Sequence, residues 1–156
     1  MEKIILDRVD RKLLALLQED ATMSVATIAE RIGLSSTPVW KRIKRLEESG
    51  LISRRVAILD REKLGLGIVV MVAVRAASHS DEWLSAFSEG VARIPEVLEF
   101  YRMSGEIDYL LKVIARDIGD YDRIYRKLIK VADLRDVSSS FAMQEIKSTT
   151  ALPLYE

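Results

Sequence analysis

The side chains most able to do chemistry gather in a basic cluster within the first third of the chain. From Lys41 to Arg55 the sequence holds six Lys and Arg residues against two Glu residues. Cations presented on one face of a helix can bind DNA phosphates and the hydrogen-bonding edges of bases. Charged clusters also arise as ordinary solvated surface, so the elements that carry the cluster decide between the two interpretations.

The cluster lies on the second of two short helices joined by a tight turn. Ser24 can cap the first helix, whose apolar residues recur at helical spacing over 25–32, and Gly33 can end it in a left-handed conformation. Ser35 or Thr37 can cap the second helix. The buried stripe of that second helix is predicted to be Val39, Ile43 and Leu46. This pattern is typical of a helix-turn-helix, whose second helix enters the major groove of DNA.

The exposed residues of the second helix form the predicted DNA interface. We expect three of them at base edges and three at phosphates: Ser36, Thr37 and Lys41, then Arg42, Lys44 and Arg45. Trp40 either reads the groove or packs against the first helix of the domain. Residues 1–63 carry 13 Lys and Arg against 10 Asp and Glu, in a chain with 24 of each. This mild asymmetry supports a nucleic-acid module joined to an acidic second domain.

Composition excludes several kinds of site. The chain has no Cys, which removes disulfides, thiolate metal sites and cysteine nucleophiles. The only histidine, His79, lies in a polar loop with no acid–base partner nearby in sequence, so we expect it to face solvent. The first residues lack the apolar core of a signal peptide, and the longest apolar run, Leu66 to Val74, is shorter than the roughly 20 residues of a membrane helix. We expect a soluble, cytoplasmic protein without metal or other cofactor.

The second half alternates between strand and helix patterns. A β-branched run at Ile68–Val74 predicts a strand largely buried on both faces, and further strands are expected at Val97–Met103, at Tyr109–Ala115 and from about Val137 to Thr149. Two helices are predicted between them. One is capped by Ser80 and buries Trp83, Phe87, Val91 and Ile94; the other is capped by Asp117 and buries Ile118, Tyr121, Ile124, Tyr125, Leu128 and Val131. The order βαββαβ is the ferredoxin-like arrangement.

The predicted fold class is therefore α+β, with two domains. Residues 1–52 form a winged helix-turn-helix domain, in which a first helix opens at Asp7 and a short strand follows Gly50 (Leu51, Ile52, then Val56 to Leu59). Residues 53–66 form a hinge strand and linker. Residues 67–156 form a ferredoxin-like, ACT-like domain. The paired glycines before Ile68 lack the remaining features of a dinucleotide-binding loop and are interpreted as a hinge.

Three strings carry a resemblance that covers essentially the whole chain. GLSSTPVWKRIKRLEESG followed by ISRR, MSGEIDYLLKV, and SSFAMQEIKSTT resemble, in order and spacing, the Lrp/AsnC family of bacterial and archaeal transcription regulators. The most specific motif is Ser104-Gly105-x-x-Asp108-Tyr109-Leu110-Leu111. The resemblance implies a DNA-binding domain, a hinge strand and an amino-acid-sensing domain, in dimers that assemble into tetramers or octamers. Within the family, the strings look closest to regulators of amino-acid catabolism, some of which respond to cysteine.

The resemblance also implies an effector site in a cleft between subunits. Gly105 and Asp108 match the family positions that line this cleft, whereas on the residues alone the same turn is an ordinary β-turn. Asp108 can pair with the ammonium group of a free amino acid, and backbone N–H groups around Gly105 can bind its carboxylate. The predicted effector-binding set is Arg102, Met103, Ser104, Gly105, Asp108, Tyr109, Ser139, Ser140 and Phe141. Family members selective for branched side chains often carry larger apolar residues where this chain has a serine run, which argues against leucine and leaves a smaller or more polar effector open.

The sequence thus favours a transcription regulator that binds double-stranded DNA specifically and responds to a free amino acid. Two alternatives stay open: an architectural DNA-binding protein without effector response, and an enzyme of amino-acid metabolism. The enzyme is disfavoured because the sequence offers no nucleophile with a partnered base, no metal-ligand spacing and no phosphate loop. The expected partners are DNA, an amino acid and further copies of the chain, and no membrane.

Overall fold

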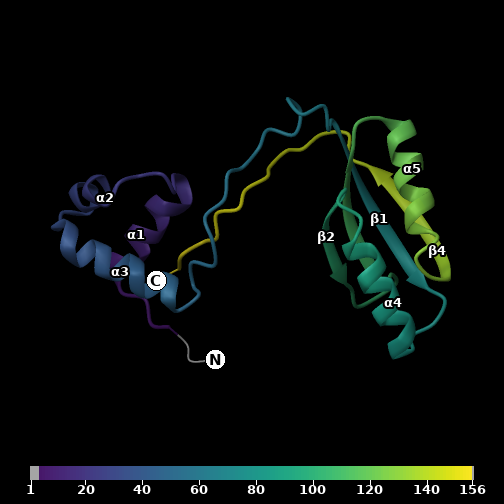
Figure 1. Cartoon of the computed structure of the whole chain (residues 1–156), viewed down its shortest axis with the longest axis horizontal. Helices are drawn as coiled ribbons and strands as arrows, with labels where there is room; N and C mark the ends of the chain where they lie inside the picture. The colour runs from purple at the N-terminus through teal and green to yellow at the C-terminus, as the bar shows by residue number, and fades with distance from the viewer. Residues whose placement is uncertain (1–3, 156) are drawn as a thin grey trace. The chain divides into compact units, whose positions relative to one another are not determined.

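The computed structural model describes residues 4–155, which fall into two compact units (Figure 1). The first unit comprises the residues up to Ile58 together with the segment from Lys147 onward, and the second comprises Leu59–Ile146. Each unit has its own cluster of buried apolar side chains. No helix in the described range is long and apolar enough to cross a membrane.

Three helices form the body of the first unit: α1 (Arg8–Glu19), α2 (Val25–Ile32) and α3 (Ser36–Glu48). The predicted caps of α1 and α2 are confirmed, whereas Ser35 lies at the N-cap of α3 but makes no side-chain capping hydrogen bond. Asp7 accepts a hydrogen bond from the Asp10 N–H, and the Ser24 hydroxyl accepts one from the Thr27 N–H at 3.1 Å. Gly33 ends α2 at a φ of 74°, a conformation that residues with a Cβ rarely adopt. The helix-turn-helix is thereby fixed by local sequence.

The strand predicted after Gly50 is not formed. Residues 53–60 have no regular secondary structure, and residues 61–65 form a turn. A strand exists only where a neighbouring strand accepts and donates its backbone hydrogen bonds, and in the described chain residues 49–67 pair with none. Val56, Ile58 and Leu59 are consequently exposed. The prediction of a wing strand and a hinge strand was therefore wrong for the single chain. The helix-turn-helix and the α+β fold class are confirmed.

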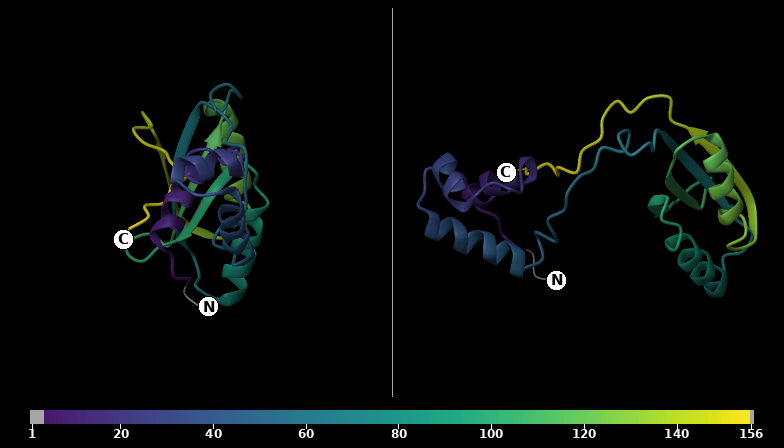
Figure 2. Two further views of the ribbon diagram at one scale, coloured as in Figure 1. Left: turned by 90° about the vertical axis from the view of Figure 1, so that its left-hand side faces the viewer. Right: turned by 45° about the horizontal axis from the view of Figure 1, so that its top comes forward.

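The second unit is a four-stranded antiparallel sheet with two helices on one face (Figure 2). Along the chain, its elements are β1 (Ile68–Ala76), α4 (Asp81–Ala92), β2 (Val97–Arg102), β3 (Tyr109–Ala115), α5 (Ile118–Leu128) and β4 (Leu134–Phe141). The strand order across the sheet is β2-β3-β1-β4. This confirms the ferredoxin-like βαββαβ arrangement. Ser80 and Asp117 cap α4 and α5, as predicted.

The two faces of the sheet differ in burial. The face under α4 and α5 carries Val70, Val72 and Val74 of β1, all fully buried against Phe87 and other core residues. Met71 and Ala73, which alternate with them, are only half-buried because both helices lie on the other side. The prediction that Ile68–Val74 is largely buried on both faces therefore holds in full only for the helix-covered face, since on the other face Val69 is buried but Met71 and Ala73 are not. We use "open face" below for the side that includes Met71 and Ala73.

Two further predictions fail near helix and strand ends. Ile118, expected in the buried stripe of α5, is 70% exposed because it is the first residue of the helix and lies beyond the sheet. The last strand ends at Phe141 and not near Thr149. Partial alternation of apolar and polar residues extends past Phe141, but sheet pairing with β1 stops there.

The segment after Lys147 packs on α1, as the yellow end of the chain in Figure 2 illustrates. The Gln18 side chain exchanges two hydrogen bonds with the Leu152 backbone, at 2.6 and 3.1 Å. The Arg11 guanidinium donates to the Tyr155 carbonyl at 2.7 Å, and Leu154 packs against the apolar cluster of the first unit. The sequence prediction had placed this segment in the second domain. Because of these contacts, the first unit is built from both ends of the chain.

Candidate nucleic-acid interface and ligand-binding turn

Helix α3 buries one stripe and exposes the rest. Val39, Ile43 and Leu46 are buried, as predicted, and pack against α1 and α2. The predicted base-edge residues Ser36, Thr37 and Lys41 are all exposed, and so is Lys44. The structure thus leaves the N-terminal half of α3 accessible, with its polar and cationic side chains on the surface.

Trp40 lies on the exposed side of α3. Half of its surface is accessible, and it is absent from the apolar cluster of the first unit. The Lys44 ammonium lies 5.2 Å from the centre of its ring, within reach of a cation–π contact. Of the two roles that the sequence left open, the structure therefore disfavours packing against the first helix.

Arg42 and Arg45 of α3 are engaged by α1. The Arg42 guanidinium contacts Asp7 at 2.6 Å and Asp10 at 2.8 Å, and Arg45 contacts Asp10 at 2.6 Å. Asp10 is only 1% exposed. The hydrogen bond from Arg42 to Asp10, followed by the one to Asp7, raises the pKa of Arg42. The pKa of Asp7 is lowered, first by the hydrogen bond from the Asp10 N–H and then by the one from Arg42. Two residues predicted at phosphates therefore also anchor α3 to α1.

The sequence carried a signal for this anchor that was not used. Asp7 and Asp10 form a reciprocal capping box, in which each carboxylate accepts a hydrogen bond from the other's backbone N–H. Asp10 lies in the first turn of α1, where the helix dipole also favours an acid. A buried acid requires a cationic partner, so its burial would have pointed to the arginines of α3.

The turn between β2 and β3 brings together Met103, Ser104, Gly105 and Asp108 of the predicted effector set. Gly105 has a φ of 128°, and a Cβ placed on it would meet no atom within 4 Å. The position therefore requires glycine for its backbone conformation, while the space beside it stays open. Met103 donates its N–H to the Asp108 carbonyl at 2.8 Å, which closes the turn.

Asp108 ties this turn to the end of β1. Its N–H donates to the Val74 carbonyl at 3.0 Å, and its Oδ2 accepts the Ala76 N–H at 2.8 Å. Its Oδ1 lies 3.9 Å from His79 Nε2. His79 is exposed, as predicted, and the fold brings beside it an acidic residue that is distant in sequence.

The remaining predicted effector residues divide between the two faces of the sheet. Tyr109 is 4% exposed and packs against Phe87 and Trp83 in the core. On β4, Ser139 hydrogen-bonds the Tyr121 hydroxyl and Phe141 meets the Tyr121 ring edge to face, both on the helix-covered side. Arg102 pairs with Tyr109 in the strand register, and Ser140 pairs with Met71 on the open face.

The open face combines apolar residues with one polar cluster. Leu110 and Ile114 of β3 lie there with Met71 and Ala73 and are likewise half-buried. Glu99 accepts hydrogen bonds from the Tyr101 hydroxyl at 2.7 Å and the Lys112 ammonium at 3.1 Å. These two contacts, Tyr101 first, lower the pKa of Glu99. A half-buried apolar surface with one satisfied ion pair is suited to pairing with another protein surface.

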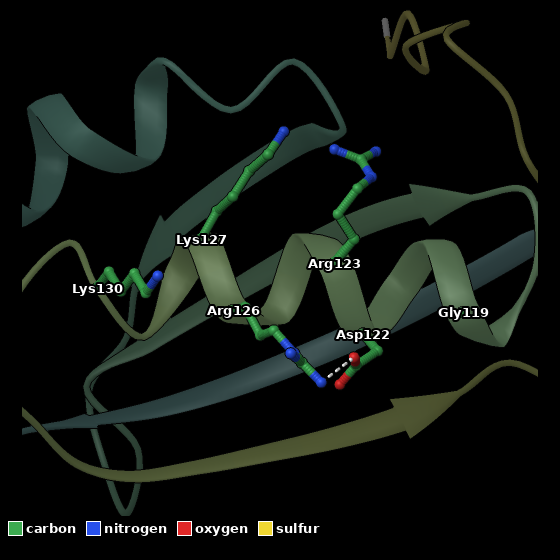
Figure 3. A pocket seen from close by; sticks show the side chains of 6 residues that line it. All are labelled: Gly119, Asp122, Arg123, Arg126, Lys127 and Lys130. Atoms are coloured by element: carbon green, nitrogen blue, oxygen red, sulfur yellow. Dashed lines mark ion pairs between the residues drawn. The ribbon is translucent and has the colours of Figure 1, made fainter.

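A basic depression on α5 is not a convincing anion site. Figure 3 shows this space of about 400 Å³, which is lined by Gly119, Asp122, Arg123, Arg126, Lys127 and Lys130. Arg126 pairs with Asp122 at 2.9 Å. Arg123 and Lys127 both reach Glu96 Oε1, at 2.8 and 3.6 Å. Burial raises the pKa of Glu96, but these cations and its hydrogen bonds outweigh it and lower the pKa overall. Most of the positive charge is thus neutralised within the unit.

No group of three or more potential metal-ligating side chains is found within residues 4–155. The chemical features that stand out are therefore the exposed face of α3 and the turn at Gly105. Together with the fold, they define a class: a helix-turn-helix unit with an exposed polar and cationic helix, joined to a ferredoxin-like unit whose Gly105 turn is a candidate ligand site.

Two family models match the chain. One, described as an AsnC-type helix-turn-helix domain, matches residues 6–47, and the other, described as the Lrp/AsnC ligand binding domain, matches residues 69–152. The chain belongs to the Lrp/AsnC family of transcriptional regulators. It is a DNA-binding transcriptional regulator with a domain for a small-molecule effector, and it is not an enzyme.

Individual relatives match over nearly the full length. The DNA-binding transcriptional activator DecR of Escherichia coli K12 is 50% identical over 151 residues, which cover 96% of this chain and 99% of the relative. A crystal structure of an AsnC family regulator from Agrobacterium tumefaciens has 55% identity and a TM-score of 0.92, covering 95% of this chain and 97% of that one. A regulator from Neisseria meningitidis in complex with L-methionine has 33% identity and a TM-score of 0.91, covering 96% and 97%.

Proposed function

We propose that this regulator reads DNA with the exposed half of α3 and that a free amino acid, bound at the Gly105–Asp108 turn, modulates it. The observation that supports DNA recognition is the separation of α3 into a buried stripe and an exposed polar face. Ser36, Thr37 and Lys41 are proposed at base edges. Lys44, Arg42 and Arg45 are proposed at phosphates, with the two arginines also holding α3 against α1.

The salt dependence of DNA binding tests the cationic face. Removing one phosphate contact lowers the slope of log affinity against log salt by about one. Lys44→Ala is the sharpest variant because Lys44 has no contact with α1, and its ion pair with Glu48 is long, at 3.7 Å. Lys63→Ala removes the same charge from the turn outside α3 and serves as control. A heterogeneous duplex DNA is the probe, and an equal slope for both variants would refute the assignment of Lys44.

An amino acid as effector is supported by three observations. The family's ligand-binding domain covers the turn, a relative was solved with L-methionine, and Asp108 offers a carboxylate beside an unobstructed glycine. A thermal-shift screen with the twenty amino acids identifies the effector. Calorimetric titration then compares the wild type with Asp108→Asn, which removes the charge but keeps an acceptor for the Ala76 N–H.

We expect Asp108→Asn to weaken binding by about 30-fold or more, because a desolvated ammonium loses its charged partner. Glu106→Gln removes an exposed charge from the same turn and should have little effect. Equal affinity of wild type and Asp108→Asn would remove Asp108 from the site. The absence of a response to any amino acid would favour the architectural DNA-binding alternative.

We also propose that the open face of the sheet pairs with a second copy of the chain. Met71, Ala73, Leu110 and Ile114 offer apolar area that solvent only partly covers. Closed two-fold symmetry is the simplest way to hide such a face, and tetramers or octamers are built from such dimers. Sedimentation of the full chain at micromolar concentration tests this proposal, and Met71→Glu should shift the protein towards monomer.

A further inference from the structure

The strand register places an arginine beside Asp108 that the sequence prediction did not include. Val74 of β1 and Tyr109 of β3 are register partners, and both are buried under the helices. Side chains alternate along a strand, so Arg75, which follows Val74, lies on the opposite face of β1. Asp108 comes just before β3, and it lies beside Arg75 because its N–H donates to the Val74 carbonyl and its Oδ2 accepts the Ala76 N–H. A cation and an anion therefore stand side by side at this end of the sheet.

Arg75 is held in place by the turn itself. Its Nε donates to the Glu106 carbonyl at 2.9 Å, one residue beyond Gly105. In the described part of the chain, its two terminal nitrogens have no hydrogen-bond or ion-pair partner, although Asp136 is its register neighbour on β4. The guanidinium is thus oriented through one nitrogen, and the fork formed by the other two is available to a ligand.

Asp108 is complementary to this arrangement. One oxygen, Oδ2, is used by the Ala76 N–H, while Oδ1 has only the longer 3.9 Å contact with His79. A free amino acid presents an ammonium and a carboxylate on the same carbon, so its site needs an anion and a cation next to each other. A carboxylate is matched best by the planar two-pronged donor of arginine.

We propose that Arg75 binds the α-carboxylate of the effector, while Asp108 Oδ1 binds its ammonium. This inference rests on the proposed effector function and deepens it. In this proposal Arg75, and not the backbone N–H groups around Gly105, is the main partner of the effector carboxylate. It also selects Arg75 over Arg102, since Arg102 pairs with Tyr109 and so belongs to the helix-covered side of the sheet. The chemical class recognised is a zwitterionic α-amino acid with a free carboxylate.

The test crosses protein variants with ligand variants on the full chain. The ligands are the amino acid that gives the largest thermal shift and its α-carboxamide, which keeps the ammonium and the side chain but has no carboxylate charge. The protein variants are Arg75→Gln, Arg75→Lys and, as a matched control, Arg135→Gln on exposed β4. Circular dichroism confirms that each variant is folded before its affinity is measured by calorimetry.

We expect the wild type to bind the amino acid about 30-fold or more tightly than the amide. Arg75→Gln should bind the amino acid about as weakly as the amide, with its amide affinity close to that of the wild type. Arg75→Lys should be intermediate, because lysine keeps the charge but not the fork. Arg135→Gln should behave as the wild type.

Two results would overturn the inference. Arg75→Gln could keep the full preference for the free carboxylate, which would assign the carboxylate to other donors. It could also weaken both ligands equally, which would limit Arg75 to bracing the turn through the Glu106 carbonyl. In either case, weaker amino-acid binding by Asp108→Asn would still support the proposed effector site. If the wild type binds no amino acid, both the inference and the proposed effector function are wrong.

Discussion

Replacing Asp10 by asparagine tests whether the ion pairs between α1 and α3 stabilise the DNA-binding unit. Asp10 is 1% exposed, and its two oxygens contact Arg42 at 2.8 Å and Arg45 at 2.6 Å. Asparagine has almost the same shape. It keeps an acceptor for the Asp7 N–H, so the variant removes the charge without opening a cavity.

The size of the effect follows from the exposure of the partners. A hydrogen bond to a charged group contributes about 1.5–3 kcal/mol, and a neutral one about 1 kcal/mol. Losing the charge at two contacts would therefore cost about 2–3 kcal/mol if both partners were buried. The side chains of Arg42 and Arg45 are 28% and 53% exposed, so water replaces part of the loss. We expect the free energy of unfolding of the first unit to fall by about 1–2 kcal/mol.

The two tryptophans allow each unit to be followed separately. Trp40 belongs to the first unit and Trp83 to the second. Urea unfolding is monitored by Trp40 fluorescence in a Trp83→Phe background, with and without Asp10→Asn. Glu48→Gln is the control, because its exposed i,i+4 pair with Lys44 should contribute less than about 0.5 kcal/mol. Equal stability of Asp10→Asn and the background would refute the anchoring role, as would an equal loss in the control.

Three further substitutions probe the packing and electrostatics of the two units. Leu154→Ala should destabilise the first unit by about 1 kcal/mol, seen by Trp40 and not by Trp83, because Leu154 packs on the core of that unit. In Asp120→Asn, the free energy of unfolding of the second unit, measured by Trp83 fluorescence, should fall less steeply below about pH 4 than in the wild type. Hydrogen bonds from Arg116, then Arg123, lower the pKa of Asp120, so its contribution is present above the unfolded pKa and is lost as the pH falls. Gly90→Ala should destabilise the second unit by about 1 kcal/mol in urea, because its Cβ would overlap Val131.

Each of these has a matched control at an exposed site: Leu64→Ala, Asp122→Asn and Ser85→Ala. A loss seen equally by both tryptophans in Leu154→Ala would contradict the assignment of the C-terminal segment to the first unit. Unchanged acid unfolding in Asp120→Asn would mean that its ion pairs do not survive in solution. A stabilised Gly90→Ala protein would show that the neighbouring side chain moves aside at little cost.

Features that depend on local chemistry were predictable from the sequence. Asp7, Ser24, Ser80 and Asp117 each cap a helix because a short polar side chain reaches a backbone N–H two or three residues ahead. Gly33 ends α2 because only glycine adopts the left-handed conformation without strain. The order of strands and helices in the second unit followed from periodicity, and the resemblance to a known family pointed to the Gly105–Asp108 turn as a candidate ligand site.

Features that depend on pairing between distant segments were not predictable. The strand expected after Gly50 has the right composition but no partner in the described chain, and the last strand stops where its pairing with β1 stops. Nothing in the local pattern of the C-terminal segment indicates that Gln18 and Arg11 of α1 bind its backbone. Local pattern fixes what a segment can form, and only the rest of the chain fixes whether it does.

The candidate ligand site shows why the same limit matters for function. The motif at Gly105 identified the turn and its acid, because both lie within five consecutive residues. The proposed cation, Arg75, stands at the end of β1, far earlier in the sequence, and reaches the turn because β1 pairs with β3 in antiparallel register and the Arg75 Nε donates to the Glu106 carbonyl. A shift of that register by one residue would turn Arg75 to the helix-covered side. The chemistry at the turn is therefore set by the sheet as a whole, so the buried valines of β1, which fix the register, determine which charges meet at the turn.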